Sequence, residues 1–176
     1  MTSLAEQVVA IHGSLEAAGI PHAFGGALAL AWCTEQARGT IDIDVNLFVG
    51  VEEADAALAA LPAEVTVSDA NRAAIADGGQ ARLWWDATPI DVFFNTSGFH
   101  AEAAGRADHR WFEGTRVPFL SCRDLAVFKT FFNRTRDWAD LEEMAAAGNL
   151  DTAAVVGEVA RHLGEDDERV ERLRSL

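Results

Sequence analysis

Two aspartates, Asp42 and Asp44, stand two residues apart in a segment rich in β-branched residues, 40–49. In an extended strand this spacing places both side chains on the same face. Two carboxylates so close together repel each other unless a cation lies between them. Mg²⁺ prefers carboxylate, water and phosphate oxygens, so the pair is a candidate metal site. The alternative is the solvated outer face of an edge strand, which is the more common role of an isolated Asp-x-Asp.

A glycine pair, Gly25 and Gly26, lies upstream, between a short apolar run and a stretch of strong helix propensity. Glycines between a strand and a helix let backbone N–H groups approach an anion at the positive end of the helix. A glycine pair alone also marks ordinary turns. Its place ahead of the Asp pair, with Arg38 and Thr40 just before the expected strand, is more specific and makes these four residues candidates for nucleotide binding.

A third carboxylate, Asp91, lies inside the apolar run at residues 88–95. Its neighbours indicate a largely buried sheet, and an unpaired charge is costly to bury. Three explanations remain open: Asp91 binds a metal, pairs with an arginine, or handles a catalytic proton. With the Asp pair, it completes a set of three carboxylates on strands that could be neighbours.

The elements that must position these side chains follow from periodicity and turn signals. Ser3 and Glu6 have the spacing of a capping box, which begins an amphipathic helix that ends before Gly19. Two apolar runs around Asp86-Ala87 predict an antiparallel hairpin. We expect strands at residues 22–24, 40–49, 64–67, 80–85, 88–95 and 115–120, the last as a Pro-containing edge strand, and helices at 4–18, 27–32, 52–61, 69–76, 121–132, 137–147, 151–163 and 166–173; residues 98–105 are ambiguous.

The composition fits a single globular unit of 176 residues, with an α/β core at 1–120 and a C-terminal helical segment at 121–176 packed on it. No apolar stretch reaches the roughly 18 residues that a membrane helix needs, so we expect no membrane segment and a cytoplasmic protein. Cys33 and Cys122 form neither a metal-binding spacing nor a disulfide framework, and we expect both to be reduced and mostly buried.

The formal charge of −14 argues against extended contact with nucleic acid. One stretch, residues 106–136, is locally cationic and contains the chain's only lysine, Lys129. The histidines are scattered and form no ligand spacing. Aromatic residues near the third carboxylate are expected to cover the sheet and not to stack on a base; they are Trp84, Trp85, Phe93 and Phe94.

Two segments resemble a known family. FGGALALAWCTEQARGTIDIDVNLFV is similar to the glycine turn and Asp-x-Asp strand of polymerase-β-like nucleotidyltransferases, and Asp91 in PIDVFF falls where they have a third carboxylate. Downstream, SCRDLAVFKTFFNRTRDWADLEEM resembles the AbiEii/AbiGii-type toxin nucleotidyltransferases and their relatives. The resemblance covers about residues 20–145 and implies a nucleotidyltransferase-like mixed sheet flanked by helices.

The resemblance also implies roles for individual residues. Gly25 and Gly26 would hold a nucleoside triphosphate, the Asp pair would ligate two Mg²⁺ (or Mn²⁺), and Asp91 would bind one metal or deprotonate the acceptor. Lys129 would contact the β- and γ-phosphates; the alternative is a solvated helix residue. Two further residues, Asp137 and Asp140, would orient Lys129 or Arg134, or would be surface charges at helical spacing.

Two classes of function follow. An active enzyme would transfer a nucleoside monophosphate to a hydroxyl on a protein, an RNA or a small molecule, and an antibiotic nucleotidyltransferase is one version. The acidic composition favours a protein or small-molecule acceptor. The other class is a catalytically idle nucleotidyltransferase fold that binds nucleotide or a protein, such as an antitoxin-type partner in a toxin–antitoxin pair.

Overall fold

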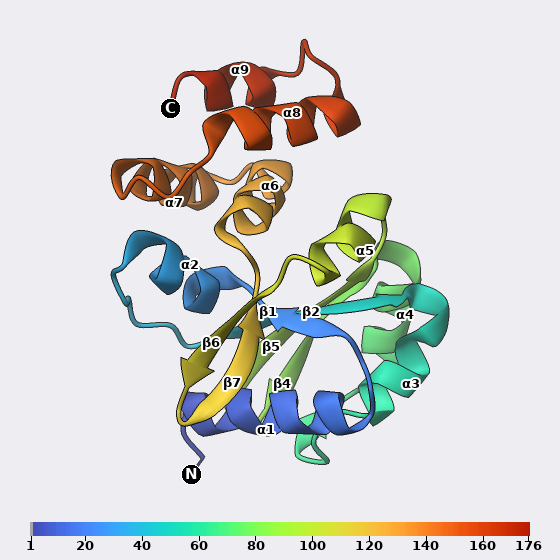
Figure 1. The fold of residues 1–176 in the computed structure, drawn as a ribbon. Coiled ribbons are helices and arrows are strands. Elements are labelled where there is room, and N and C mark those ends of the chain that lie inside the picture. The colour runs from blue at the N-terminus through green and yellow to red at the C-terminus, as the bar shows by residue number, and fades with distance from the viewer. Residues whose placement is uncertain (1) are drawn as a thin grey trace.

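A seven-stranded mixed sheet forms the centre of the molecule, with the strand order β3-β4-β5-β2-β1-β7-β6 (Figure 1). The structure is a computed structural model that describes residues 2–176. The strands are β1 (His22–Phe24), β2 (Ile43–Gly50), β3 (Val65–Thr66), β4 (Gln80–Trp85), β5 (Thr88–Asn95), β6 (Asp108–Phe112) and β7 (Thr115–Phe119). The helices are α1 (Leu4–Ala17), α2 (Gly26–Thr34), α3 (Ala54–Ala59) after the 3-10 turn η1 (Val51–Glu53), α4 (Asp69–Gly78), α5 (Gly98–Ala104), α6 (Cys122–Phe132), α7 (Thr135–Ala146), α8 (Thr152–Leu163) and α9 (Glu168–Arg174).

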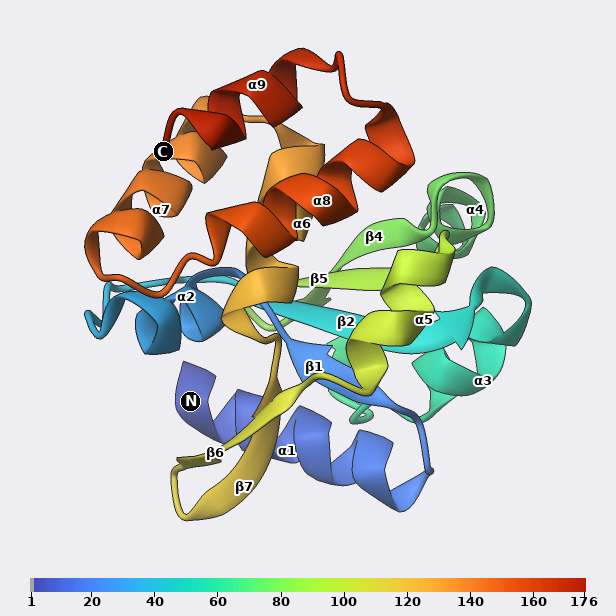
Figure 2. The ribbon, with the colours of Figure 1, turned by 45° about the horizontal axis from the view of Figure 1, so that its top comes forward.

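Helices cover both faces of the sheet, which confirms the expected α/β class. Figures 1 and 2 show α1 and α3 below the sheet and α2 and α6 above it. Strand β2 is central and runs parallel to β5 and antiparallel to β1. Its residues alternate: Ile43, Val45 and Leu47 are fully buried, whereas Asp44 and Asn46 project from the opposite face.

The helix that opens the chain forms as its sequence predicts. The Ser3 hydroxyl accepts a hydrogen bond from the Glu6 backbone N–H, and the Glu6 carboxylate accepts one from the Ser3 N–H, which completes the capping box. Val8, Ile11 and Leu15 are fully buried, so one face of α1 packs into the core.

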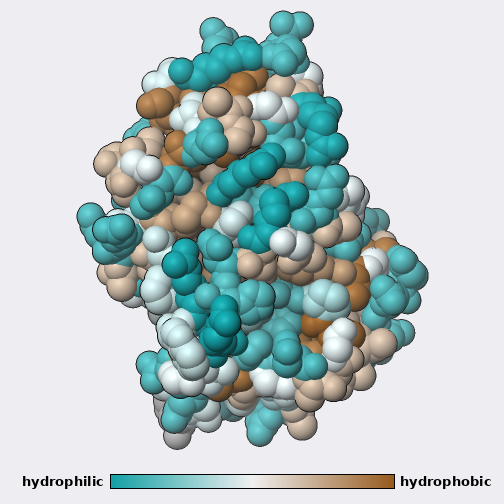
Figure 3. All heavy atoms as spheres, viewed as in Figure 1, coloured by the Kyte–Doolittle hydropathy of each residue, from teal (hydrophilic) through white to brown (hydrophobic). Residues whose placement is uncertain are grey.

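Helices α6 to α9 gather above α2 and the sheet, and the C-terminus lies far from the N-terminus (Figure 1). Trp138, Leu141 and Val159 are among the buried residues that hold this group together. The outer face seen in Figure 3 is mostly hydrophilic, with scattered hydrophobic patches. None of the described helices is long and apolar enough to cross a membrane.

The expectation that residues 115–120 form an edge strand is wrong. Strand β7 lies between β1 and a strand that the sequence did not predict, β6, which forms the edge. The hairpin between them turns at Glu113 and Gly114, both with positive φ, as a two-residue hairpin requires. Pro118 is tolerated because β1 pairs with β7 only at Phe119.

The expectation that both cysteines are reduced is also wrong. Cys33 near the end of α2 and Cys122 at the start of α6 form a disulfide, with Cα atoms 5.5 Å apart across 89 residues of sequence. The two residues belong to helices that pack against each other. The fold brings them within bridging distance, which no local spacing could indicate.

Two of the scattered histidines meet in the fold. Nδ1 of His12 in α1 lies 2.9 Å from Nε2 of His22 in β1, and Nδ1 of His22 lies 2.8 Å from the Ile20 carbonyl oxygen. Both rings are largely buried. Burial is the main cause that lowers the pKa of each, so the pair is neutral near pH 7.

Candidate active site

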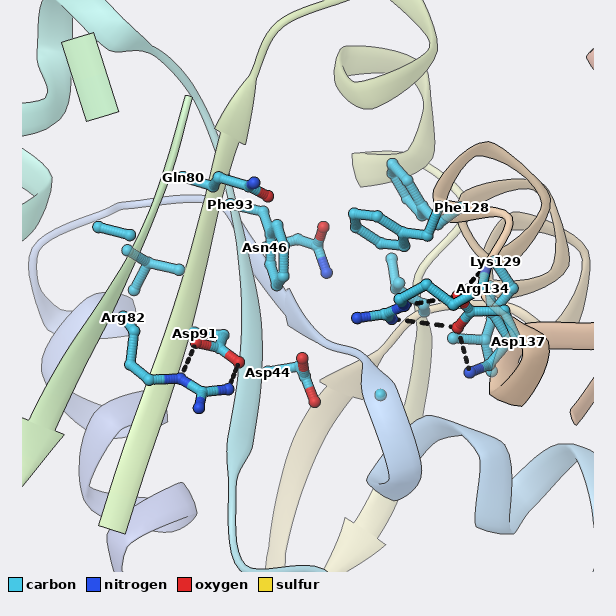
Figure 4. A pocket seen from close by; sticks show the side chains of 16 residues that line it. Asp44, Asn46, Gln80, Arg82, Asp91, Phe93, Phe128, Lys129, Arg134 and Asp137 are labelled. Atoms are coloured by element: carbon cyan, nitrogen blue, oxygen red, sulfur yellow. Dashed lines mark hydrogen bonds and ion pairs between the residues drawn. The ribbon is translucent and has the colours of Figure 1, made fainter. Parts of the chain in front are cut away.

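A cleft of about 400 Å³ opens between the sheet on one side and α6 and the start of α7 on the other. Its floor consists of β2, β5 and β4, with Gly26 of α2 beside them, and its opposite wall belongs to α6 and α7. Figure 4 shows charged side chains converging from both sides. A cleft that joins the carboxylates of the sheet to cations on the helices can hold an anionic ligand together with a cation.

Three charged residues form one row across the floor of the cleft. Asp44 on β2 is in register with Asp91 on β5, and Asp91 is in register with Arg82 on β4. The Arg82 guanidinium donates hydrogen bonds of 2.8 and 2.6 Å to the two Asp91 oxygens (Figure 4). Of the explanations open for Asp91, an arginine partner is therefore the one present, and Asp44 is left without such a partner.

The glycine turn and Asp44 fit closely together. The Gly25 N–H donates to the Asp44 backbone carbonyl at 2.9 Å, so β2 fixes the start of α2. Gly26 has φ +53°, and a Cβ on it would lie 1.8 Å from Asp44 Oδ2. Only glycine fits there, because the carboxylate occupies the space of a side chain. This packing holds Asp44 at the N-terminus of α2.

The negative charge of Asp44 is only partly balanced by nearby positive charges. Burial raises its pKa, the carboxylates of Asp42 and Asp91 raise it further, and the more distant Lys129 and Arg134 lower it only in part, giving a pKa of about 6. A carboxylate in such surroundings gains from a cation that binds to it.

Lys129 is buried, which rules out the solvated-helix interpretation. Its Nζ donates to Asp140 Oδ2 at 2.5 Å and lies 3.6 Å from Asp137 Oδ1. Arg38 donates to both Asp140 oxygens, at 2.6 and 3.1 Å. Burial acts to raise the pKa of Asp140, but the hydrogen bonds from Arg38 and Lys129 outweigh it and hold that pKa below its usual value.

Arg134 extends into the cleft from the start of α7 (Figure 4). Its Nε and Nη2 donate to the Asp137 carboxylate at 2.7 and 3.1 Å, and its guanidinium lies 4.9 Å from the centre of the Phe132 ring. The side chain is 68% exposed. Asp140 accepts a hydrogen bond from Lys129 and Asp137 accepts one from Arg134, which are the contacts that the predicted orienting roles require.

Some of the predicted site residues line the cleft, and others lie outside its lining. Gly26, Asp44, Asp91 and Lys129 line it. The other candidates do not line it; they are Gly25, Arg38, Thr40, Asp42 and Asp140. Arg38 and Asp140 support Lys129 from behind.

Asp42 does not lie on the strand where the sequence placed it. Strand β2 begins at Ile43, and the Thr40 hydroxyl donates to Asp42 Oδ1 at 2.5 Å. Short hydroxyl and carboxylate side chains form such local bonds in competition with regular sheet pairing. Asp42 therefore acts on Asp44 through its charge, from the edge of the cleft.

Sequence reasoning missed several residues that line the cleft: Asn46, Gln80 and Arg82 among the polar ones, and Phe128 and Phe132 on the helix side. Phe93 and Trp84 were expected to cover the sheet. Phe93 instead lines the cleft, and Trp84 is 46% exposed. The available signal was the period of two along the strands: Asn46, Gln80 and Phe93 each lie two positions from a charged residue, on the same face of the sheet.

A metal ion fits the chemistry of this site in part. Within residues 2–176, no three His, Cys, Asp or Glu side chains converge as a ready ligand cage. Asp44 is the carboxylate whose raised pKa shows an unmet need for positive charge. Carboxylates are the ligands that Mg²⁺ and Mn²⁺ prefer, so the donor chemistry fits, while Arg82 holds the neighbouring carboxylate of Asp91.

Ion pairs neutralise much of the cationic stretch at residues 106–136. Its paired bases are Arg106 with Asp124, Arg110 with Asp108, Arg123 with Glu158, Lys129 with Asp140, and Arg134 with Asp137. A base already paired with an acid contributes less to a phosphate-binding track. The acidic protein therefore does not present this stretch as a continuous basic surface.

Solved nucleotidyltransferases share the fold. A crystal structure of ANT(2″)-Ia in complex with adenylyl-2″-tobramycin aligns with 97% of this chain and 94% of that chain, with a TM-score of 0.58 and 15% identity. A solution structure of the same antibiotic-resistance factor covers 97% and 89%, with a TM-score of 0.52 and 16% identity. An antigenic nucleotidyltransferase-like protein from Paracoccidioides brasiliensis covers 98% and 87%, with a TM-score of 0.51 and 10% identity.

No protein-family model and no curated protein matches the sequence. At these identities the solved structures show a common fold. The nucleotidyltransferase-like architecture expected from the glycine turn and the Asp-x-Asp segment is thereby confirmed.

Proposed function

We propose that the protein is a metal-dependent nucleotidyltransferase that moves a nucleoside monophosphate from a nucleoside triphosphate to a hydroxyl group of an acceptor. The observation that carries the proposal is the position of Asp44, packed on Gly26 at the N-terminus of α2 and facing Lys129 and Arg134 across one cleft. The shared fold supports it.

The triphosphate would bind between the helix N-terminus and the two cations. Free N–H groups in the first turn of α2 and the positive end of its dipole favour anions. Lys129 is held in place by Asp140, and Arg134 by Asp137, so both reach the phosphates with little loss of side-chain freedom.

Replacement of Lys129 tests the phosphate end. Lys129→Met keeps the apolar stem and removes a charge-assisted contact, so triphosphate affinity should fall by roughly ten- to a hundredfold. Monophosphate affinity should hardly change. Isothermal titration with a non-hydrolysable triphosphate and with the monophosphate measures both, and Arg136→Met is an exposed control on α7. An equal loss for both nucleotides would contradict a role at the β- and γ-phosphates.

Asp44 and Asp91 are the cleft residues that would hold Mg²⁺ or Mn²⁺, and Asp42, the third predicted ligand, stands outside the lining. When bound, the ion would neutralise phosphate charge and polarise the acceptor hydroxyl. Arg82 must release Asp91 for this role, and its side chain, which is 51% exposed, has room to turn into solvent. Asp42 adds its charge from the edge of the cleft.

The reaction itself needs positioning and one proton acceptor. The acceptor oxygen forms a bond to the α-phosphorus, the bond from that phosphorus to the bridging oxygen breaks, and pyrophosphate leaves with the electron pair. The hydroxyl proton passes to a carboxylate, for which Asp91 is the candidate after Arg82 has released it.

The acceptor would be a protein, an RNA or a small molecule. The acidic composition and the ion pairs at residues 106–136 favour a protein or a small molecule over an RNA. The AbiEii/AbiGii-type resemblance of residues 121–144 supports a macromolecular acceptor and an antitoxin-type partner. The ANT(2″)-Ia fold likeness favours a second candidate, transfer to an antibiotic.

Label transfer tests the function. Each α-labelled nucleoside triphosphate is incubated with the protein, Mg²⁺ or Mn²⁺ and a lysate as the source of acceptors, and in a separate arm with tobramycin. We expect label on a macromolecule or small product with the wild type and with Asp77→Asn, an exposed control, and none with Asp44→Asn. Nucleotide binding without any transfer would support the catalytically idle fold.

A further inference from the structure

A second row of side chains crosses the cleft floor beside the charged one. Asn46 on β2 is in register with Phe93 on β5, and Phe93 is in register with Gln80 on β4. Each lies two residues from a member of the Asp44–Asp91–Arg82 row, so both rows face the cleft, about 7 Å apart. The second row carries no charge: an aromatic ring stands between two amides.

Asn46 is an unusual residue to find in such a place. It is 5% exposed, lines the cleft, and its amide has no hydrogen-bond partner in the part of the chain that the structure describes. Figure 4 shows this amide directed into the space between Phe93 and Phe128. Its polar atoms are not among the fully buried ones that lack a partner, so they are open to the cleft, where a ligand can bond to them.

Aromatic rings enclose the same space from the helix side. Phe128 is buried and held by Phe99 and His100, at ring-centre distances of 5.0 and 4.5 Å. Phe132 is 42% exposed and lies 5.7 Å from Phe93 across the mouth of the cleft. One aromatic wall is therefore fixed, and the other is at the surface, where it can move to admit a flat group.

We propose that Asn46, Phe93 and Gln80 form a binding site for a planar, uncharged ring whose edge both donates and accepts hydrogen bonds. Each amide offers a donor and an acceptor, and the aromatic faces provide stacking. No carboxylate belongs to this row, so it does not suit a cationic ring. The site deepens the proposed function and rests on it, because the charged row beside it would hold the metal, and Lys129 and Arg134 across the cleft would hold the phosphates.

Two sources can supply such a ring: the base of the nucleoside triphosphate, or a ring on the acceptor. Both rows line the same cleft, so a ring bound at one row lies beside a metal or phosphate bound at the other. The same chemistry applies to both sources, and the experiment separates them.

Two substitutions that we expect to leave the fold intact test the row. Gln80 is exposed and Phe93 is half-buried, so Gln80→Met and Phe93→Leu avoid the risk attached to the buried Asn46. Gln36→Met is the matched control, since Gln36 is exposed and does not line this cleft. The dissociation constants of adenosine, guanosine, cytidine and uridine, of the matching triphosphate, and of inorganic tripolyphosphate are measured with Mg²⁺ for each protein.

If the ring is the base, Phe93→Leu should weaken the preferred nucleoside and its triphosphate about tenfold, as the loss of stacking predicts, and leave tripolyphosphate unchanged. If the ring belongs to the acceptor, triphosphate binding stays the same, and label transfer to the lysate acceptor slows in both variants. Both results support the ring site and identify its source.

The ring site is overturned if wild-type protein binds tripolyphosphate and transfers label while both variants behave like Gln36→Met in every assay. The proposed transferase fails by a different pattern: nucleosides bind and depend on Phe93, but tripolyphosphate does not bind and no label moves. The two failures are therefore distinguishable in one set of measurements.

Discussion

At the scale of single residues, the Asp44 carboxylate lies against Gly26 and near the carboxylates of Asp42 and Asp91. Its charge state responds to whatever else enters the cleft, and two measurable effects follow. The first is the pH dependence of the stability of the ligand-free protein, and the second is the affinity for added metal.

Asp44→Asn should stabilise the ligand-free protein near pH 8 and have little effect near pH 4. The folded pKa of about 6 lies above the ordinary value, so the favourable contribution of protonated Asp44 is present at pH 4 and is lost as the pH rises through 6. The gain of the variant should reach roughly 1–3 kcal/mol. Thermal unfolding in EDTA from pH 4 to 8 measures it, with Asp77→Asn as the control. A pH-independent difference would contradict the explanation.

Metal binding should depend on Asp44 more than on Asp42. Calorimetric titration of Mn²⁺ in the presence of a non-hydrolysable triphosphate should show binding that Asp44→Asn removes. Asp42→Asn should weaken it less, because the Asp42 side chain does not line the cleft and is engaged by Thr40. Unchanged Mn²⁺ affinity in both variants would exclude the carboxylates as ligands.

At the scale of elements, the turn from β1 into α2 permits no side chain at Gly26. Gly26→Ala should displace Asp44, because the new Cβ would collide with its carboxylate and φ is positive. We expect a loss of more than about 1 kcal/mol in unfolding free energy, and loss of triphosphate binding.

Gly13→Ala is the matched control, because Gly13 lies inside α1 with nothing within 4 Å of a new Cβ. That change should stabilise the protein by about 0.5–1 kcal/mol. Urea unfolding of both variants provides the comparison. If Gly26→Ala were as harmless as Gly13→Ala, the close packing on Asp44 would be incorrect.

The sequence predicted elements well where the signal was local. The capping box at Ser3 and the hairpin at residues 80–95 appear as expected. It missed β6, whose polar residues do not alternate clearly, although Glu113-Gly114 suits a tight hairpin turn. The edge assignment of β7 failed because strand order depends on pairing between distant segments.

The site was predictable to the same degree. The glycine turn and the carboxylates are recognisable from their immediate neighbours, because a glycine pair between a strand and a helix, and an aspartate within an apolar strand, are both uncommon. Arg82 was missed because its importance comes from its register opposite Asp91, and Asn46 because its burial beside the glycine turn depends on the pairing of strands distant in sequence. Such neighbours are set by the packing of the whole chain.

At the scale of the whole molecule, the disulfide joins the glycine-turn helix to the Lys129 helix, across the two parts of the chain. In the chain-entropy model, a closed loop of 89 residues stabilises the folded state by roughly 4–5 kcal/mol. Reduction should therefore lower the midpoint of thermal unfolding by roughly 10 °C.

Scanning calorimetry with and without a phosphine reductant measures this change. The double variant Cys33→Ala/Cys122→Ala should unfold at the lower temperature and be indifferent to the reductant. If the wild type did not respond either, the two cysteines would not be joined in solution.

The same bond gives the polypeptide an unusual connectivity. Residues 33–122 become a covalent ring that contains β2 to β7, while the glycine turn and Lys129 lie on two tails, each about two helical turns from the point of closure. A protease cut within the ring leaves the two pieces joined by the disulfide, and they separate only under reduction. After denaturation, a cut in either tail releases a fragment without any reductant. Peptide maps on paired non-reducing and reducing gels would thus show which cuts fall inside the ring and which fall in the tails that carry the glycine turn and Lys129.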